Sequence, residues 1–270
     1  MLEIKQITPS DLRENQQNLD EYLKSEFSQL VSAKTWMTLD EHLIKRFQLQ
    51  KFMIITEDEF SDFQWDTRYV NELAVRTFRH VSQYLSFDHV RLTIVPSLPF
   101  PFFKDQPKPL WIHAFTNGPG NIVIAIPAQL DDDFFQYLLA HELHHASPKN
   151  PIYSLTLNSF TLEEWYKMEG AAEFFSLSLF PDKRWWKENL PAELEKDYWN
   201  KIKEHLKTTD DHIKSNLCFG DADKGVPVFA GNSFALKVVS HYVKTHQVED
   251  INELFLVKAS DLMECYKAMH

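Results

Sequence analysis

The amino-acid sequence predicts an α+β fold that is mostly helical, with one small mixed or antiparallel sheet. Two observations carry this prediction. Apolar residues recur at helical spacing over residues 8–85 and again in the second half of the chain. Between these regions, β-branched residues and period-two alternation indicate short strands. A helix with two histidines and a glutamate directly follows these strands.

The N-terminal region, residues 1–87, is expected to be helical. Three helices are predicted there, over 10–32, 38–50 and 66–85. We expect them to form a scaffold that packs as one unit with the rest of the chain, residues 88–270. No heptad, repeat or low-complexity tract favours a coiled coil or a solenoid.

The sheet is expected from three strands, over 90–95, 111–116 and 121–126. The last two are joined by the turn sequence Asn117-Gly118-Pro119-Gly120, which predicts a hairpin. The predicted sheet therefore precedes the histidine-containing helix in the chain.

That helix contains H-E-x-x-H within an apolar run. Residues four apart lie on one face of an α-helix, so His141 and His145 can each direct an imidazole to one metal ion, and Glu142 can reach a water bound there. Zinc lowers the pKa of such a water toward roughly 7, and Glu142 can accept its proton as a general base. The pattern predicts a zinc-dependent hydrolase, most often of peptide bonds.

The ends of this helix are marked in the sequence. Asp131, Asp132 and Asp133 supply an N-cap and an acidic first turn, and the stretch from Ser147-Pro148 to Asn150-Pro151 ends the helix. The motif is therefore expected in the last turns of a buried helix. A metal is the partner that suits two histidines and a glutamate there, because burying them alone is unfavourable.

A catalytic zinc site needs a third protein ligand and keeps one position for water. Glu169 is the best candidate, on a second predicted helix that Thr161 and Glu164 cap and that ends near Pro181. The small residues Gly170, Ala171 and Ala172 are expected to let this helix approach the H-E-x-x-H helix closely. Glu173, one turn later on the same face, is expected to orient a histidine N–H rather than to bind the metal.

His144 leaves an alternative open, since His141 and His144 at a spacing of three could also converge on a metal. We prefer His145 because only that choice places Glu142 as in known zinc hydrolases. His144 is then expected to support the ligands or to be partly exposed.

The sequence H-E-L-H-H followed by E-G-A-A-E resembles the YjaZ-like family of predicted zinc-dependent proteases, whose members pair H-E-x-H-H with E-G-x-A-E. The stretch from Cys218 to Gly231 is similar to the closing segment of that family, so the resemblance spans roughly residues 88–245. More widely, the pattern is similar to the gluzincins, including zinc aminopeptidases with an N-E-G sequence. This resemblance implies that Glu169 rather than Glu173 is the third ligand.

Two positions depart from these patterns. Met168 stands where the aminopeptidases have asparagine, and Asn232 follows Gly231 where the YjaZ-like family commonly has a tyrosine. A tyrosine at that point therefore does not stabilise the oxyanion in this chain. The other nominal donors cannot be ranked by spacing; they are His113, Tyr153, Tyr166, His241 and Tyr242.

Composition and net charge limit the cellular location and the partners that we expect for this protein. The chain has 270 residues, 44% of them hydrophobic, and no apolar run near the roughly 18 residues of a membrane span. The absence of a signal-peptide pattern and of a disulfide framework, with only Cys218 and Cys265, favours a cytoplasmic protein. A net charge of −11 without a basic cluster argues against nucleic acid and anionic membranes as partners.

The sequence therefore predicts a zincin-like, gluzincin-type metallopeptidase with one zinc ion per chain and a peptide or protein substrate. The hairpin is expected to offer an edge strand on which an extended peptide binds. Two alternatives remain open: a zinc hydrolase of a non-peptide amide or ester, and a peptide-binding or regulatory protein that does not turn over.

Overall fold

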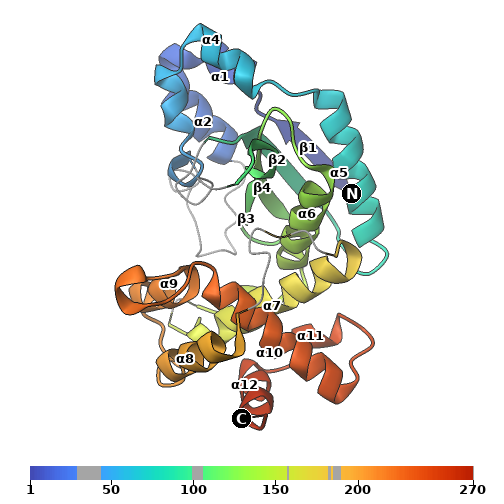
Figure 1. Cartoon of the computed structure of the whole chain (residues 1–270). Helices are drawn as coiled ribbons and strands as arrows, with labels where there is room; N and C mark the ends of the chain where they lie inside the picture. The colour runs from blue at the N-terminus through green and yellow to red at the C-terminus, as the bar shows by residue number, and fades with distance from the viewer. Residues whose placement is uncertain (29–43, 99–105, 157, 182–183, 185–189, 270) are drawn as a thin grey trace. The chain divides into compact units, whose positions relative to one another are not determined.

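The computed structural model describes residues 1–28, 44–98, 106–156, 158–181, 184 and 190–269 (Figure 1). The chain divides into two compact units, residues 1–148 and 149–270. The first unit holds the sheet and the H-E-x-x-H helix, and the described part of the second is built mainly from helices. The predicted α+β, mostly helical class is confirmed. The predicted division at residues 87 and 88 stays a prediction, since compact units do not by themselves define domains.

A four-stranded mixed sheet of order β1-β2-β4-β3 forms the centre of the first unit. The strands are β1 Leu2–Gln6, β2 Val90–Pro96, β3 His113–Thr116 and β4 Asn121–Ile126. β1, β2 and β4 are parallel, and β3 pairs antiparallel with β4 through the predicted hairpin. β3 therefore lies at one edge of the described sheet.

β1 is a strand within residues 1–87, the region that the sequence predicts to be helical, and it precedes the helical pattern that begins near residue 8. Its five residues are too short for a periodic signal, and the strand is held by pairing with β2, for example Ile4 with Leu92. Because the two strands are parallel, the chain between them crosses over through the N-terminal helices.

Helices cover both faces of this sheet (Figure 1). Val123 and Ala125 pack into a core with the helices near the N-terminus. Side chains alternate along a strand, so Ile122 and Ile124 face the opposite side, where α5 and α6 lie. All four side chains are fully buried. The H-E-x-x-H helix therefore packs on one face of this sheet.

The N-terminal helices are shorter than predicted. They are α1 Pro9–Glu14, α2 Leu19–Ser28, α4 Glu57–Phe60 and α5 Thr67–Val81, with 3-10 helices η1 Gln16–Asn18, η2 Leu49–Ile54 and η3 Ser61–Phe63. The helix predicted over 10–32 is interrupted because Asn15 leaves helical geometry, and its last residues lie outside the described ones.

The second and third helices predicted for the N-terminal region can also be compared with the structure. Residues 38–43 of the helix predicted over 38–50 lie outside the described residues. The described part ends before residue 50, and Gln48 takes the left-handed conformation with φ of 54°. The start predicted for the third helix is confirmed, since the Asp66 side chain accepts hydrogen bonds from the first turn of α5.

The H-E-x-x-H helix is α6, Asp132–Ala146. It begins as predicted, with the Asp131 side chain accepting a hydrogen bond from the amide of Phe134 at 2.8 Å. It ends at Ser147 as predicted. The amide of Gly120 in the hairpin donates to the last helical carbonyl, Ala146, at 2.9 Å. The hairpin and the end of α6 are therefore fixed to each other.

The second unit contains six helices among its described residues: α7 Leu162–Leu179, α8 Ala192–Ile202, α9 Asp211–Phe219, α10 Ala230–His246, α11 Glu253–Leu256 and α12 Ala259–Lys267. α7 is capped by Thr161 as predicted and ends two residues before Pro181. α10 is central and packs against α7, α9 and α12. Short 3-10 helices complete the chain: η5 Lys108–Leu110, η6 Pro151–Ser154 and η7 Ala222–Lys224.

Close packing in this unit depends on two helical glycines. A Cβ on Gly170 of α7 would lie 2.3 Å from the carbonyl oxygen of Ala235, and one on Gly231 of α10 would lie 2.6 Å from the Cα of Cys218. Neither position has room for a larger residue without moving a backbone. No helix in the described residues combines the length and apolar character needed to cross a bilayer.

Candidate metal centre

Two imidazoles converge near the C-terminal end of α6. The Nε2 atoms of His141 and His145 lie 3.0 Å apart, and the two rings are close to perpendicular. Both side chains are buried. Helical geometry brings these two residues onto one face, as the sequence predicts. Such a pair of nitrogens is suited either to share a proton or to bind one cation.

Glu142 is held by the hairpin. The hydroxyl of Thr116, the last residue of β3, donates to Oε2 of Glu142 at 2.7 Å and also lies 3.0 Å from its backbone oxygen. Both residues are buried. A hydrogen bond to a charged carboxylate is stronger than one between neutral groups, so Thr116 restricts the orientation of the Glu142 side chain.

His144 is almost wholly buried, so the expectation of partial exposure is wrong for this residue. Burial and, to a smaller extent, the neighbouring His145 and His141 hold the pKa of His144 well below its usual value. Its ring lies 6.3 Å from that of His145, measured between centroids. Within α6, the ring nitrogen that lies beside Nε2 of His141 therefore belongs to His145 and not to His144.

The glutamates of the E-G-A-A-E sequence lie on α7 in the second unit. Glu169 is half-buried, and Oε2 of its carboxylate accepts a hydrogen bond from Nδ2 of Asn232 on α10 at 3.3 Å. The negative charge of Glu169 adds to burial in raising the pKa of the Cys218 thiol.

Glu173 is fully buried one turn beyond Glu169, and the Ser176 hydroxyl donates to its backbone carbonyl at 3.1 Å. The roles of Glu169 as a metal ligand and of Glu173 as its support stay predictions.

The nominal oxyanion donors are placed differently from one another. The hydroxyl of Tyr166 pairs with that of Tyr198 at 2.7 Å in the core of the second unit. His113 stacks on Phe47, and burial, with a smaller contribution from Arg46, lowers its pKa to about 3. Tyr153 lies in η6 and is partly buried. None of these contacts selects a donor.

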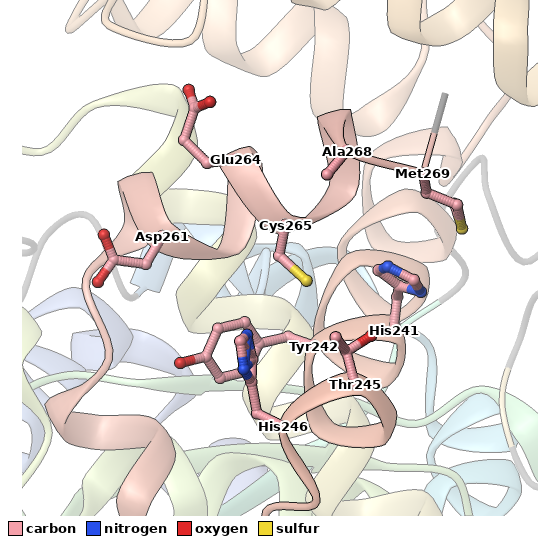
Figure 2. Close-up of a pocket in the computed structure, with 9 residues that line it drawn as sticks. All are labelled: His241, Tyr242, Thr245, His246, Asp261, Glu264, Cys265, Ala268 and Met269. Atoms are coloured by element: carbon pink, nitrogen blue, oxygen red, sulfur yellow. The ribbon is translucent and has the colours of Figure 1, made fainter.

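His241 and Tyr242 line a separate cleft of about 690 Å³, formed by α10, α12 and the residues that follow α12 (Figure 2). The thiol of Cys265 points into this cleft from α12. Among the described residues, no three metal-ligating groups converge there. The cleft begins more than two helical turns along α10 from Asn232, so it is distinct from the surroundings of Glu169.

Sequence reasoning missed two residues that contact the predicted site. Thr116 was assigned to a strand, but its contact with Glu142 depends on how the hairpin packs on α6. Asn232 was noted only as a replacement for a tyrosine, and its contact with Glu169 depends on the packing of α10 on α7. A polar residue at the end of a strand or next to a helical glycine is the only signal that could have drawn attention to either.

Comparison with known proteins agrees with this description. The chain belongs to the family described as "Predicted Zn-dependent protease (DUF2268)", whose model matches residues 105–264. The match includes β3, β4, the H-E-x-x-H helix and the E-G-A-A-E helix. It confirms the resemblance found in the sequence and supports a zinc-dependent protease. No curated protein and no solved structure matches the chain.

Proposed function

We propose that this protein is a zinc-dependent peptidase of the gluzincin type, in which His141, His145 and Glu169 hold one zinc ion per chain. The observation that carries the proposal is the convergence of two buried imidazole nitrogens on the helix that also holds Glu142. Family membership supports zinc as the metal and proteolysis as the activity.

The imidazole pair fits zinc. Zinc–nitrogen bonds measure about 2.0–2.1 Å, so two nitrogens on a tetrahedral zinc ion lie roughly 3.3 Å apart. The separation of 3.0 Å between the Nε2 atoms is close to that value. Two imidazoles and a carboxylate are also the donor set of many catalytic zinc sites.

Glu169 is proposed as the third ligand on three grounds. It occupies the glutamate position of the E-G-A-A-E sequence, its carboxylate is only half-buried, and one of its oxygens is already held by Asn232. Glu173 is fully buried on the same face of α7, so we propose that it orients a ligand imidazole.

Zinc bound by these groups would polarise a substrate carbonyl and lower the pKa of a coordinated water toward roughly 7. Glu142 then takes the proton from the attacking water and delivers it to the leaving amine. Its side chain is buried and accepts a hydrogen bond at Oε2 from Thr116, which favours one orientation of the base. A base fixed in this way needs little reorganisation when the proton moves.

A peptide is the substrate class that the sheet favours. β3 is an edge strand of the described sheet, and its last residue, Thr116, contacts Glu142. An extended peptide that pairs with such an edge would gain main-chain hydrogen bonds by β-augmentation. The scissile bond would then lie beside the general base.

The test combines elemental analysis with cleavage of a peptide library by the native protein and by Glu142→Gln. We expect one zinc per chain in both proteins and cleavage that is about 10²- to 10⁴-fold slower in the variant, the usual range for loss of a general base. Glu72→Gln, an exposed position on α5, is the matched control and should cleave normally. Zinc without cleavage would contradict the peptidase assignment, and unchanged cleavage by Glu142→Gln would remove Glu142 from its role.

A further inference from the structure

Asn232 lies in the first turn of α10 and is 6% exposed. Its Nδ2 lies 3.3 Å from Oε2 of Glu169. An ionised carboxylate can only accept hydrogen bonds, so the amide must present its nitrogen to Glu169 and its oxygen elsewhere. The contact therefore has one orientation.

The oxygen of the same amide is buried without a hydrogen-bond partner among the described residues. Burying an unsatisfied acceptor lowers the stability of the folded chain, whereas a leucine of similar size would bury no polar group there. An asparagine at this position therefore lowers the stability of the folded chain relative to an apolar residue of similar size. Its hydrogen bond to Glu169 is the feature that an apolar residue would lack.

Backbone packing sets this contact. Glu169 precedes Gly170, and Asn232 follows Gly231, the two glycines whose missing Cβ atoms allow α7, α10 and α9 to approach closely. Each polar side chain therefore stands one residue from a point of closest backbone approach. The close packing at the two glycines therefore sets the spacing of the backbones that carry Glu169 and Asn232.

We propose that Asn232 is a positioning residue that holds one oxygen of Glu169 and so presents the other oxygen to the metal. This inference rests on the proposed function, in which Glu169 is a zinc ligand. A hydrogen-bonded carboxylate has lost most of its rotational freedom before the metal binds, which favours binding. Asn232 is neutral, so it orients Glu169 without cancelling the negative charge that attracts a cation.

The experiment measures two quantities for each protein: the zinc dissociation constant, by competition with a chromophoric chelator, and the thermal unfolding midpoint of the metal-free form. The variants are Asn232→Leu, which keeps the approximate size, and Asn232→Ala, which guards against misfolding of the first. Ser233→Ala is the control, because Ser233 is buried in the same turn and, among the described residues, its side chain makes no hydrogen bond to Glu169.

We expect both Asn232 variants to bind zinc about 10- to 100-fold more weakly than the native protein, the usual effect of losing such a supporting contact. The metal-free midpoint of Asn232→Leu should equal or exceed that of the native protein. Ser233→Ala should bind zinc normally. Opposite effects on zinc affinity and on metal-free stability would not arise from a purely structural role.

Three results would overturn the inference, and they are distinguishable. Native protein that binds zinc tightly while both Asn232 variants keep the same affinity would overturn this inference alone. Native protein that binds no zinc would overturn the proposed function and this inference with it. A metal-free midpoint that falls in parallel with zinc affinity in both variants would assign Asn232 a structural role instead.

Discussion

The hydroxyl of Thr116 donates a hydrogen bond of 2.7 Å to the carboxylate of Glu142, and both groups are buried. This contact joins the end of an edge strand to the H-E-x-x-H helix. It therefore links the place where a peptide would pair with the sheet to the group proposed to move the proton.

Thr116→Val tests this link, because valine keeps the shape and the strand preference but removes the hydroxyl. A hydrogen bond to a charged group contributes about 1.5–3 kcal/mol, so we expect kcat to fall about 10- to 100-fold with bound zinc unchanged. Thr93→Val, at a buried position on β2, is the matched control and should keep the native kcat. Equal kcat in the native protein and Thr116→Val would show that the contact does not orient the base.

The choice between His144 and His145 is open to a direct comparison. Only His145 has its Nε2 beside that of His141, so His145→Gln should lose tight zinc binding while His144→Gln retains it. Ligand binding stabilises the folded state by about 2.7 kcal/mol when the ligand is at 100 times its dissociation constant. Zinc should therefore raise the unfolding midpoint of His144→Gln and leave that of His145→Gln unchanged. The reverse pattern would identify His144 as the ligand.

Gly170→Ala should destabilise the second unit. Alanine normally favours a helix by about 1 kcal/mol relative to glycine, but here the added Cβ would lie 2.3 Å from the carbonyl oxygen of Ala235. Because the obstacle is backbone, we expect a net loss near 3 kcal/mol, about the upper end of the usual overpacking range. Urea unfolding measures this change.

Gly225→Ala is the control for Gly170→Ala. Its nearest neighbour is the end of the Lys201 side chain at 3.4 Å, and only its positive φ of 62° is unfavourable. We expect a loss of about 1 kcal/mol from that conformation alone. A smaller effect of Gly170→Ala than of Gly225→Ala would contradict the close approach of α7 and α10.

The stability of the first unit should fall in mild acid, partly because of His113. Burial, with a smaller contribution from Arg46, lowers the pKa of folded His113 to about 3, whereas an unfolded histidine has a pKa of about 6.5. Between these values the unfolded chain binds one more proton than the folded chain, so stability decreases as the pH falls. The decrease is at most about 1.4 kcal/mol for each pH unit from this residue.

His113→Phe isolates that contribution, since a phenyl ring can still stack on Phe47. Urea unfolding at several pH values between 4 and 8, chosen to span the roughly 6.5 pKa of unfolded histidine, should show a shallower loss for the variant than for the native protein. Parallel curves for the two proteins would mean that His113 takes up its proton equally in both states.

Local sequence signals predicted the motif helix well. Asp131 caps α6 and Ser147 ends it as expected, because caps and prolines act within a few residues of the helix end. Thr161 begins α7 for the same reason. Local signals did not locate the ends of the helices predicted over 10–32 and 38–50, where Asn15 and Gln48 leave helical geometry.

The sequence by itself determined that His141, Glu142 and His145 share neighbouring positions on one helix, because the spacing of an α-helix depends only on residues a few positions apart. The tertiary structure decided that β1 pairs with β2, that Thr116 contacts Glu142 and that Asn232 contacts Glu169. These partners are separated by many residues in the chain. Their contacts arise from the packing of whole strands and helices, which no short stretch of sequence encodes.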